Sequence, residues 1–267
     1  MDYEENEYLP LEYGRCDREV KCGYFYKYYS QSRTNPLLSS DFSEIDELPN
    51  YHPYSLVEQS QKTIFKNQLI QFFLLHFTVA EVQKIVQNYH LGNASYWHDG
   101  TIFWQLDQHL NVCGGKIMRY GENGKRFGTP YWVHSYLKRS GALQAFNLAQ
   151  CLFGLHLMRT SDLPIALVES EKTACVMSAI APHYLWMATG SLHGLHKNKL
   201  LPIKERTIIL YPDTGISRRG KSPFEQWESI CFELKEQGFR ISISDVLEKK
   251  TTQKQKEAGY DLADLYL

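Results

Sequence analysis

Short apolar runs in the last third of the chain end at acidic residues. Glu169, Asp213 and Asp245 each follow such a run directly or within two residues. Stretches with a helical period separate the runs, and this alternation predicts βα units on a mainly parallel sheet. The carboxyl ends of parallel strands lie along one edge of a sheet, so acids that are distant in sequence can meet there. Converging carboxylates are the ligands that a hard cation such as Mg²⁺ prefers.

The two parts of the chain differ in their predicted elements. After residue 150 we expect strands at 165–168, 184–188, 207–211 and 240–244, with helices at 171–180 and 224–237. Before it, Thr78 and Glu81 have the spacing of a capping box that opens a helix. The other elements expected upstream are a helix at 67–76, a hairpin of 100–107 and 112–120, an extended piece at 131–134 and a helix at 144–157.

Composition sets the class of protein. The chain has 267 residues, of which 43% are hydrophobic, enough for one large domain or two medium ones. Its formal net charge of −1 provides no overall field for nucleic acid, so any such binding needs a local basic patch. No apolar run approaches the ~20 residues of a membrane span, and the acidic first residues are unlike a signal peptide. We therefore expect a cytoplasmic protein that binds no membrane.

Two cysteines near the start of the chain have the setting of a zinc knuckle. Cys16 and Cys22 flank a polar turn, and Gly23 follows the second. Tetrahedral zinc takes four ligands, and a partner knuckle would have to precede Met1, so two unligated thiols are the competing interpretation. The other four cysteines are expected to be reduced core residues. They are Cys113, Cys151, Cys175 and Cys231.

The acidic residues have ordinary explanations as well. Glu171 has the position of a helix-dipole residue, and Asp213 lies in a Pro-Asp-Thr-Gly string that favours a turn. Glu169 stands at the strand end itself, where neither explanation applies. Repetition of strand-end acids in one predicted sheet favours a site over a set of unrelated turns.

Several motifs together resemble a Toprim domain, the metal-binding module of bacterial-type primases, of type IA and type II topoisomerases and of some nucleases. They occur in the family's order: LVESEKTA at 167–174, ATGS at 188–191, LYPDTG at 210–215 and DLAD at 261–264. Residues 100–107, 114–116 and 154–156 resemble the subdomain that precedes Toprim in replicative primases. The implied division is a knuckle remnant at 1–29, a linker at 30–61, a primase-like α+β subdomain at 62–150 and a Toprim domain at 151–267.

The resemblance implies an Mg²⁺ or Mn²⁺ site with catalytic carboxylates. Glu169 matches the family's Glu and Asp213 its first Asp, while Gly215 stands where a second Asp is usual. Asp261 and Asp264 are then the expected further metal ligands, and Asp245 is another acid available to compensate for the missing Asp. The implied activity is synthesis of RNA primers from nucleotides on single-stranded DNA, with a replicative helicase as partner, on a plasmid or mobile element. Gly215 and the incomplete knuckle leave two alternatives open: a non-catalytic DNA-binding accessory protein and a Toprim nuclease.

Basic residues supply the expected nucleic-acid and nucleotide contacts. Residues 111–139 are rich in cations interleaved with aromatic rings, a pattern that suits single strands but also occurs in a solvated hairpin. Residues 215–222 satisfy the G-x-x-x-x-G-K-S pattern of a P-loop, yet too little chain follows Lys221 for that fold, and a basic loop beside the acids is preferred. The predicted contact residues are Lys116, Arg119, Lys125, Arg126, Lys172, Arg218, Arg219 and Lys221.

Overall fold

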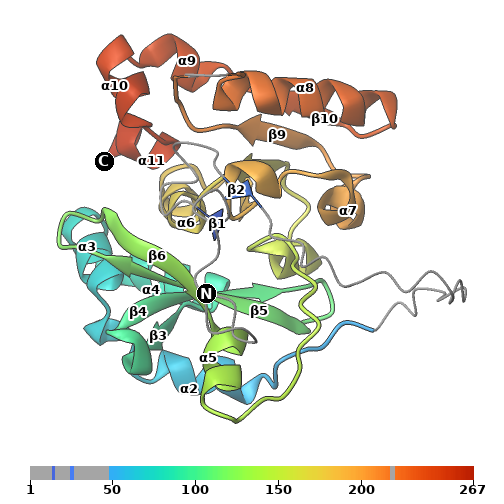
Figure 1. The fold of residues 1–267 in the computed structure, drawn as a ribbon. Helices are drawn as coiled ribbons and strands as arrows, with labels where there is room; N and C mark the ends of the chain where they lie inside the picture. Colours follow the sequence, from blue (N-terminus) through green and yellow to red (C-terminus); the bar gives the residue numbers. More distant parts are fainter. Residues whose placement is uncertain (1–13, 16–24, 27–47, 217–219) are drawn as a thin grey trace, which may run out of the picture. The chain divides into compact units, whose positions relative to one another are not determined.

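The computed structural model describes residues 14–15, 25–26, 48–216 and 220–267. The chain divides into two compact units, Met1–Glu47 and Leu48–Leu267. In the first unit, strand β1 (Gly14–Arg15) pairs antiparallel with β2 (Phe25–Tyr26). Figure 1 shows the fold of the second unit, which contains the predicted site residues Glu169 and Asp213.

The first half of the second unit is built on a four-stranded antiparallel sheet. Its order is β3-β4-β5-β6, and β4 and β5 are the two strands of the predicted hairpin. Of the extended piece expected at 131–134, residues 131 and 132 end a longer strand that returns beside β5, and residues 133 and 134 begin a helix. The strands are β3 (Gly92–Ala94), β4 (Gly100–Leu106), β5 (Val112–Tyr120) and β6 (Arg126–Trp132).

Short helices surround this sheet. The capping box of Thr78 and Glu81 is present and confirms the predicted helix start, while Asn67 caps the helix before it. A helix also forms inside the stretch 30–61, which we expected to be irregular, because Val57 is buried against the sheet. The elements are α2 (Ser55–Gln61), η1 (Ile64–Lys66), α3 (Gln68–His76), α4 (Val79–Tyr89), η2 (Ser95–Trp97) and α5 (Val133–Arg139).

The second half confirms the predicted alternation of strands and helices. A four-stranded, wholly parallel sheet has the order β10-β9-β7-β8. Its strands are β7 (Ile165–Val168), β8 (Leu185–Ala188), β9 (Ile208–Tyr211) and β10 (Ile241–Ile243). Its helices are α6 (Glu171–Ile180), α7 (Lys197–Leu200), α8 (Pro223–Glu236), α9 (Val246–Lys250), α10 (Gln253–Ala258) and α11 (Leu262–Tyr266), with η3 (Leu155–Arg159), η4 (Leu192–Gly194) and η5 (Leu201–Ile203).

The helix predicted at 144–157 is wrong. Residues 144–152 form no helix, and only the short η3 follows them. Backbone groups of this segment pair with distant residues instead: Asn147 accepts from Asn50, and Phe153 pairs with Ala188 at the edge of β8. Gly154, with φ of 83°, turns the chain directly afterwards. Long-range pairing therefore replaced the helical hydrogen bonds that the local pattern favoured.

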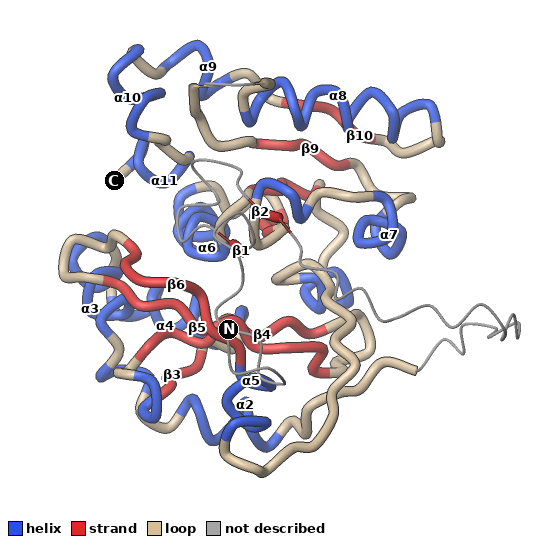
Figure 2. Tube along the Cα trace, in the orientation of Figure 1, coloured by secondary structure: helices blue, strands red, loops and turns tan. Residues whose placement is uncertain are grey.

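One apolar core lies between the two sheets. Phe103 and Met118 contribute to it from the antiparallel sheet, and Ala166 and Val168 from the parallel sheet. Helix α6 lies between the sheets in the views of Figures 1 and 2, and its buried residues belong to the same core. Separate clusters cover the outer face of each sheet. None of the described helices is both long enough and apolar enough to cross a membrane.

Candidate functional site

Two of the predicted carboxylates meet at the ends of neighbouring strands. Strand β7 ends at Val168, which lies opposite Tyr211 at the end of β9. Glu169 and Asp213 follow these strands, and the backbone N–H of Asp213 donates to Glu169 Oε1 over 3.2 Å. Both side chains are partly buried. Sheet register thus brings together two acids that are 44 positions apart in the sequence.

The charged forms of Glu169 and Asp213 are disfavoured in this pair. Burial raises the pKa of Glu169 to about 7, although the hydrogen bond from Asp213 and the positive charge of Arg126 oppose the rise. Burial also raises the pKa of Asp213 well above its usual range, and the negative charge of Glu169 adds to this. Within the described part of the chain, the buried Oδ1 atom of Asp213 has no hydrogen-bond partner. A bound cation would relieve both the repulsion and the missing partner.

Asp261 and Asp264 have a different arrangement from the one expected. Asp261 Oδ1 accepts from the Asp264 N–H and Asp264 Oδ2 from the Asp261 N–H, so the two form a capping box at the start of α11. Asp261 Oδ2 accepts from the Thr173 hydroxyl at 2.7 Å. Lys172 Nζ lies 4.0 Å from an oxygen of each aspartate. The carboxylate oxygens are thus occupied in holding α11 against α6.

Of the four carboxylates expected as metal ligands, Asp261 and Asp264 thus have other partners. Among the residues that the structure describes, no group of three or more His, Cys, Asp or Glu side chains is arranged to hold a metal ion. Asp245 does not complete such a set either, because it lies at the N-cap of α9 and pairs with Lys249 at 2.7 Å. What remains is the Glu169–Asp213 pair. Two carboxylates fit Mg²⁺, which keeps several of its water ligands in proteins.

Thr214 anchors the first part of the loop after β9. The N–H and hydroxyl of Thr214 both donate to the Tyr260 carbonyl, at 2.8 and 2.9 Å. The next residue, Gly215, is closely packed: a Cβ atom there would lie 2.9 Å from Cγ of Pro223. An aspartate at this position would require Pro223 to move. The departure from the Toprim pattern is thus accommodated by the packing of α8 against the loop.

Lys116 differs most from its expected role. We predicted it as a surface contact to nucleic acid, but it is 6% exposed. Its Nζ atom lies 3.0 and 3.1 Å from the two carboxylate oxygens of Glu171 and donates to the Gly190 carbonyl. The correction has a simple cause: Lys116 has the same orientation on β5 as Met118, which faces the parallel sheet. Glu171, expected to serve only the helix dipole, is its buried partner.

A second buried lysine lies nearby that the sequence reasoning missed. Lys199 is also 6% exposed, and its Nζ donates to the Thr189 carbonyl over 2.9 Å. Burial lowers its pKa, and the positive charge of Lys116 contributes to that lowering. The turn after β8 is thus held by two buried ammonium groups. The residues around Lys199 form no local pattern that distinguishes a buried lysine from an exposed one, so the sequence did not identify it.

The other predicted basic contacts lie in different settings. Lys125 and Arg126, at the β5–β6 turn, are exposed; burial raises the pKa values of Asp264 and Glu169, and the charges of Lys125 and Arg126 respectively oppose that rise. Lys221 donates to Ser229 at 2.6 Å, and Ser222 forms a capping box with Glu225, so neither is arranged as in a P-loop. Arg119 stacks on Phe127 away from the carboxylates. Arg218, Arg219, Cys16 and Cys22 lie outside the described residues.

Comparison with protein families gives a match over more than half of the chain. The model of a domain of unknown function, DUF6371, matches residues 67–214. The chain belongs to the DUF6371 family. The DUF6371 region contains Lys116, Glu169 and Asp213 but ends before the capping pair of α11. A zinc beta-ribbon finger model matches residues 1–37, the region of Cys16 and Cys22.

Solved structures that are similar to this DUF6371 chain include primases. The primase fragment of the bacteriophage T7 primase-helicase protein is 13% identical with a TM-score of 0.37, over 60% of each chain. The Aquifex aeolicus primase, comprising zinc-binding and RNA polymerase domains, is 13% identical with a TM-score of 0.44, over 71% of this chain and 53% of that one. The DnaG primase catalytic domain bound to single-stranded DNA is 12% identical with a TM-score of 0.40, over 80% and 83%.

These likenesses are distant and partial. The chain spans 60% of the T7 fragment and 53% of the Aquifex aeolicus chain. The low TM-scores do not establish a common fold. No curated protein matches the sequence.

Proposed function

We propose that this protein is a primase-like nucleotidyltransferase that uses Mg²⁺ or Mn²⁺ to make RNA primers on single-stranded DNA. The observation that carries the proposal is the contact of Glu169 with Asp213 at adjacent strand ends, together with the unpartnered Asp213 Oδ1. The resemblance of the motifs around these acids to a Toprim domain at 151–267 supports the same reading. In this proposal, residues 62–150 form the template-binding subdomain.

In this proposal, the acidic residues hold the metal ion and the basic residues act on the substrate phosphates and on neighbouring acids. Glu169 and Asp213 would hold the cation, which when bound supplies positive charge at a nucleotide triphosphate and lowers the pKa of an attacking hydroxyl. Lys125 and Arg126 would attract the phosphates from the exposed hairpin turn, since their charges already act on the acidic residues. Lys172 would keep Asp261 and Asp264 neutralised, so that the acidic edge of the sheet does not repel an anionic substrate.

A second candidate function is a non-catalytic DNA-binding accessory protein. The packing of Gly215 against Pro223 favours it, because the position of the second Toprim aspartate is occupied by a close contact. The Asp261 oxygens accept hydrogen bonds from the Asp264 N–H and the Thr173 hydroxyl, which also favours the accessory protein because these oxygens are then not free for a metal. On this alternative the exposed cations of the hairpin bind DNA, and the carboxylate pair is a remnant.

One assay separates these functions. The native protein is incubated with single-stranded DNA, four ribonucleotides and Mg²⁺ or Mn²⁺, beside Glu169→Gln and the control Asp245→Asn, which changes a strand-end acid outside the pair. We expect primers from the native protein and the control, and none from Glu169→Gln. Template binding without primers in any sample would favour the accessory protein. Cleavage of the template that depends on Glu169 would identify a nuclease.

Further elements of the proposal concern partners and setting. We propose that Cys16 and Cys22 contribute to a zinc-binding module, in line with the match of residues 1–37 to zinc ribbons. We further propose that the protein acts in the cytoplasm with a replicative helicase as its partner. Its role there would be in the replication of a plasmid or mobile element. Zinc content of the purified protein, measured with and without Cys16→Ser, tests the first of these.

A further inference from the structure

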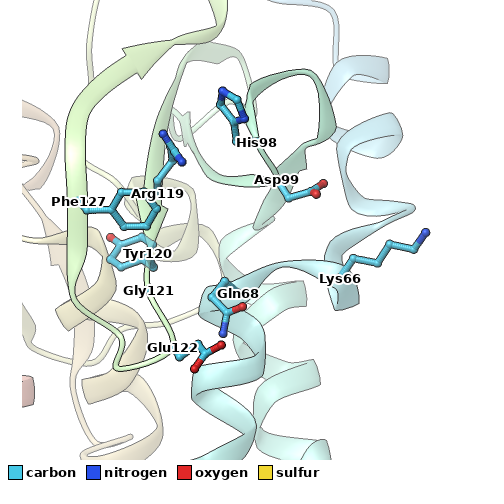
Figure 3. A pocket seen from close by; sticks show the side chains of 9 residues that line it. All are labelled: Lys66, Gln68, His98, Asp99, Arg119, Tyr120, Gly121, Glu122 and Phe127. Carbon is cyan, nitrogen blue, oxygen red and sulfur yellow. The ribbon is translucent and has the colours of Figure 1, made fainter.

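A cavity of about 360 Å³ opens on the β5–β6 hairpin, and neither Glu169 nor Asp213 lines it. Figure 3 shows the side chains that line it. Arg119, Phe127 and Glu122 come from the hairpin, Lys66 and Gln68 from the start of α3 and the turn before it, and His98 from the turn before β4. Its lining includes cations, carboxylates and an aromatic ring, so it suits a ligand that both donates and accepts hydrogen bonds.

Arg119 and Phe127 form one wall of the cavity. They lie opposite each other across β5 and β6, and the Arg119 guanidinium lies 4.4 Å above the Phe127 ring centroid. Phe127 is nevertheless 47% exposed. The buried Nε of Arg119 has no hydrogen-bond partner among the described residues. The stacking fixes the guanidinium and leaves a donor that a ligand can satisfy.

The opposite wall is rigid and strained. His98 and Asp99 both have left-handed backbone conformations, with φ of 51° each, which non-glycine residues rarely adopt. Buried amides hold this turn: Asn67 donates to the Asp99 carbonyl and Asn93 to its carboxylate, both over 2.9 Å. Backbone strain maintained by a buried polar network often marks a ligand site. The wall is therefore preorganised.

The hairpin connects the cavity to the carboxylate pair. Side chains alternate between the two faces of a strand, so Arg126 on β6 has the opposite orientation to Phe127 and does not line the cavity, whereas Tyr120 does. Arg126 acts on Glu169 electrostatically, whereas Arg119 lines the cavity. The β5–β6 hairpin therefore contributes one arginine to the cavity and another that acts on the carboxylate pair.

The positions of the hydrogen-bond donors and acceptors in the cavity indicate which ligand fits. In Figure 3, Arg119 and His98 lie toward one end of the cavity, and Gln68 and Glu122 lie toward the other. Two carboxylates in the lining, Asp99 and Glu122, oppose a phosphate group. Guanine presents acceptors on one edge, which suit arginine, and N–H donors on another, which suit a carboxylate. We propose that this cavity binds an unpaired guanine base, an inference that rests on the proposed function because that function brings single-stranded nucleic acid to the chain.

The test measures binding without catalysis. Labelled oligothymidylate with one central guanine is compared, by fluorescence anisotropy in EDTA, with the same strand carrying adenine or thymine at that position. We expect the native protein to bind the guanine strand about tenfold more tightly, the gain of one good base contact. Competition by guanosine monophosphate at similar concentration would show that the free nucleotide is also a ligand, and weak competition would assign the site to the strand.

Variants and matched controls make the result specific. Glu122→Gln and Arg119→Lys should each remove most of the preference for guanine. Glu257→Gln and Arg240→Lys make the same changes at exposed positions outside the cavity and should retain the preference. Glu122 is exposed, so its variant is expected to fold, and thermal unfolding of each variant checks this.

Several outcomes would overturn the inference. They are no binding by the native protein, equal binding of all three strands, or a preference that survives in both cavity variants. Primer synthesis without any guanine preference would reject this inference and leave the proposed function intact. A guanine preference in a protein that makes no primers would support this inference and reject the proposed function. The two results are independent because neither Glu169 nor a metal takes part in the binding assay.

Discussion

Lys116 on β5 and Glu171 on α6 form a buried ion pair, with Nζ 3.0 Å from Oε1, that joins the antiparallel sheet to the parallel one. Both side chains are almost fully buried, and Lys116 also donates to the carbonyl of Gly190 after β8. The pair thus fixes the position of β5 relative to the sheet edge that carries Glu169. Its integrity should matter for stability and for the geometry of the site.

Removal of one partner should be costly. Lys116→Met leaves the Glu171 carboxylate buried without a counter-charge, and we expect the free energy of unfolding to fall by about 3 kcal/mol or more. Lys116→Met combined with Glu171→Leu should recover a large part of that loss, since no charge is then stranded. Urea unfolding of the native protein, both single variants and the double variant measures the coupling. A loss below about 1 kcal/mol in Lys116→Met would show that the ion pair is dispensable.

Stability of the metal-free protein should depend on pH through Glu169. Its pKa is about 7 in the folded protein and 4.5 ordinarily, so between these values the folded state binds more protons than the unfolded state. Stability is therefore greatest below about pH 4.5 as far as this group is concerned, and falls as the pH rises through 7. Asp213, whose pKa is also raised, acts in the same direction. Thermal unfolding in EDTA from pH 5 to 8 tests this, with the Glu169→Gln protein expected to show a smaller slope.

Mg²⁺ should reverse that trend. A cation at the pair favours the ionised carboxylates, so the rise in melting temperature on adding Mg²⁺ should be larger at pH 8 than at pH 5. Asp213→Asn should abolish the rise and, by removing a buried like charge, make the metal-free protein more stable by about 1 kcal/mol. Asp245→Asn serves as the control and should retain the full response. An undiminished Mg²⁺ response in Asp213→Asn would contradict the assignment.

Gly215→Asp should destabilise the protein, although it restores the Toprim pattern. The new Cβ atom would lie 2.9 Å from Cγ and 3.0 Å from Cδ of Pro223, and we expect a loss of about 1–3 kcal/mol from this overpacking. Combining it with Pro223→Ala should recover part of the loss by removing the ring. Chemical denaturation of the two single variants and the double variant gives the comparison. Full stability of Gly215→Asp alone would mean that the loop adjusts freely.

Much of the fold was predictable because its signals are local. The alternation of apolar strands with helical stretches predicted the parallel sheet, and its strand ends bring Glu169 and Asp213 into contact. The capping box of Thr78 and Glu81 and the β4–β5 hairpin likewise depend on neighbouring residues. The resemblance to a Toprim domain pointed to the same two acids. The match to DUF6371 names the family and leaves its activity to experiment.

The remainder depended on contacts between distant segments. By itself, the sequence determined the strands of the parallel sheet, the helices α6 and α8 beside them, and the gathering of acids at the ends of β7 and β9. Only the tertiary structure decided that Lys116 is buried against Glu171, that Asp261 caps α11, and that 144–152 pairs with remote backbone instead of forming a helix. The physical reason is that burial and pairing of a polar group depend on what the fold places opposite it, which local periodicity does not specify.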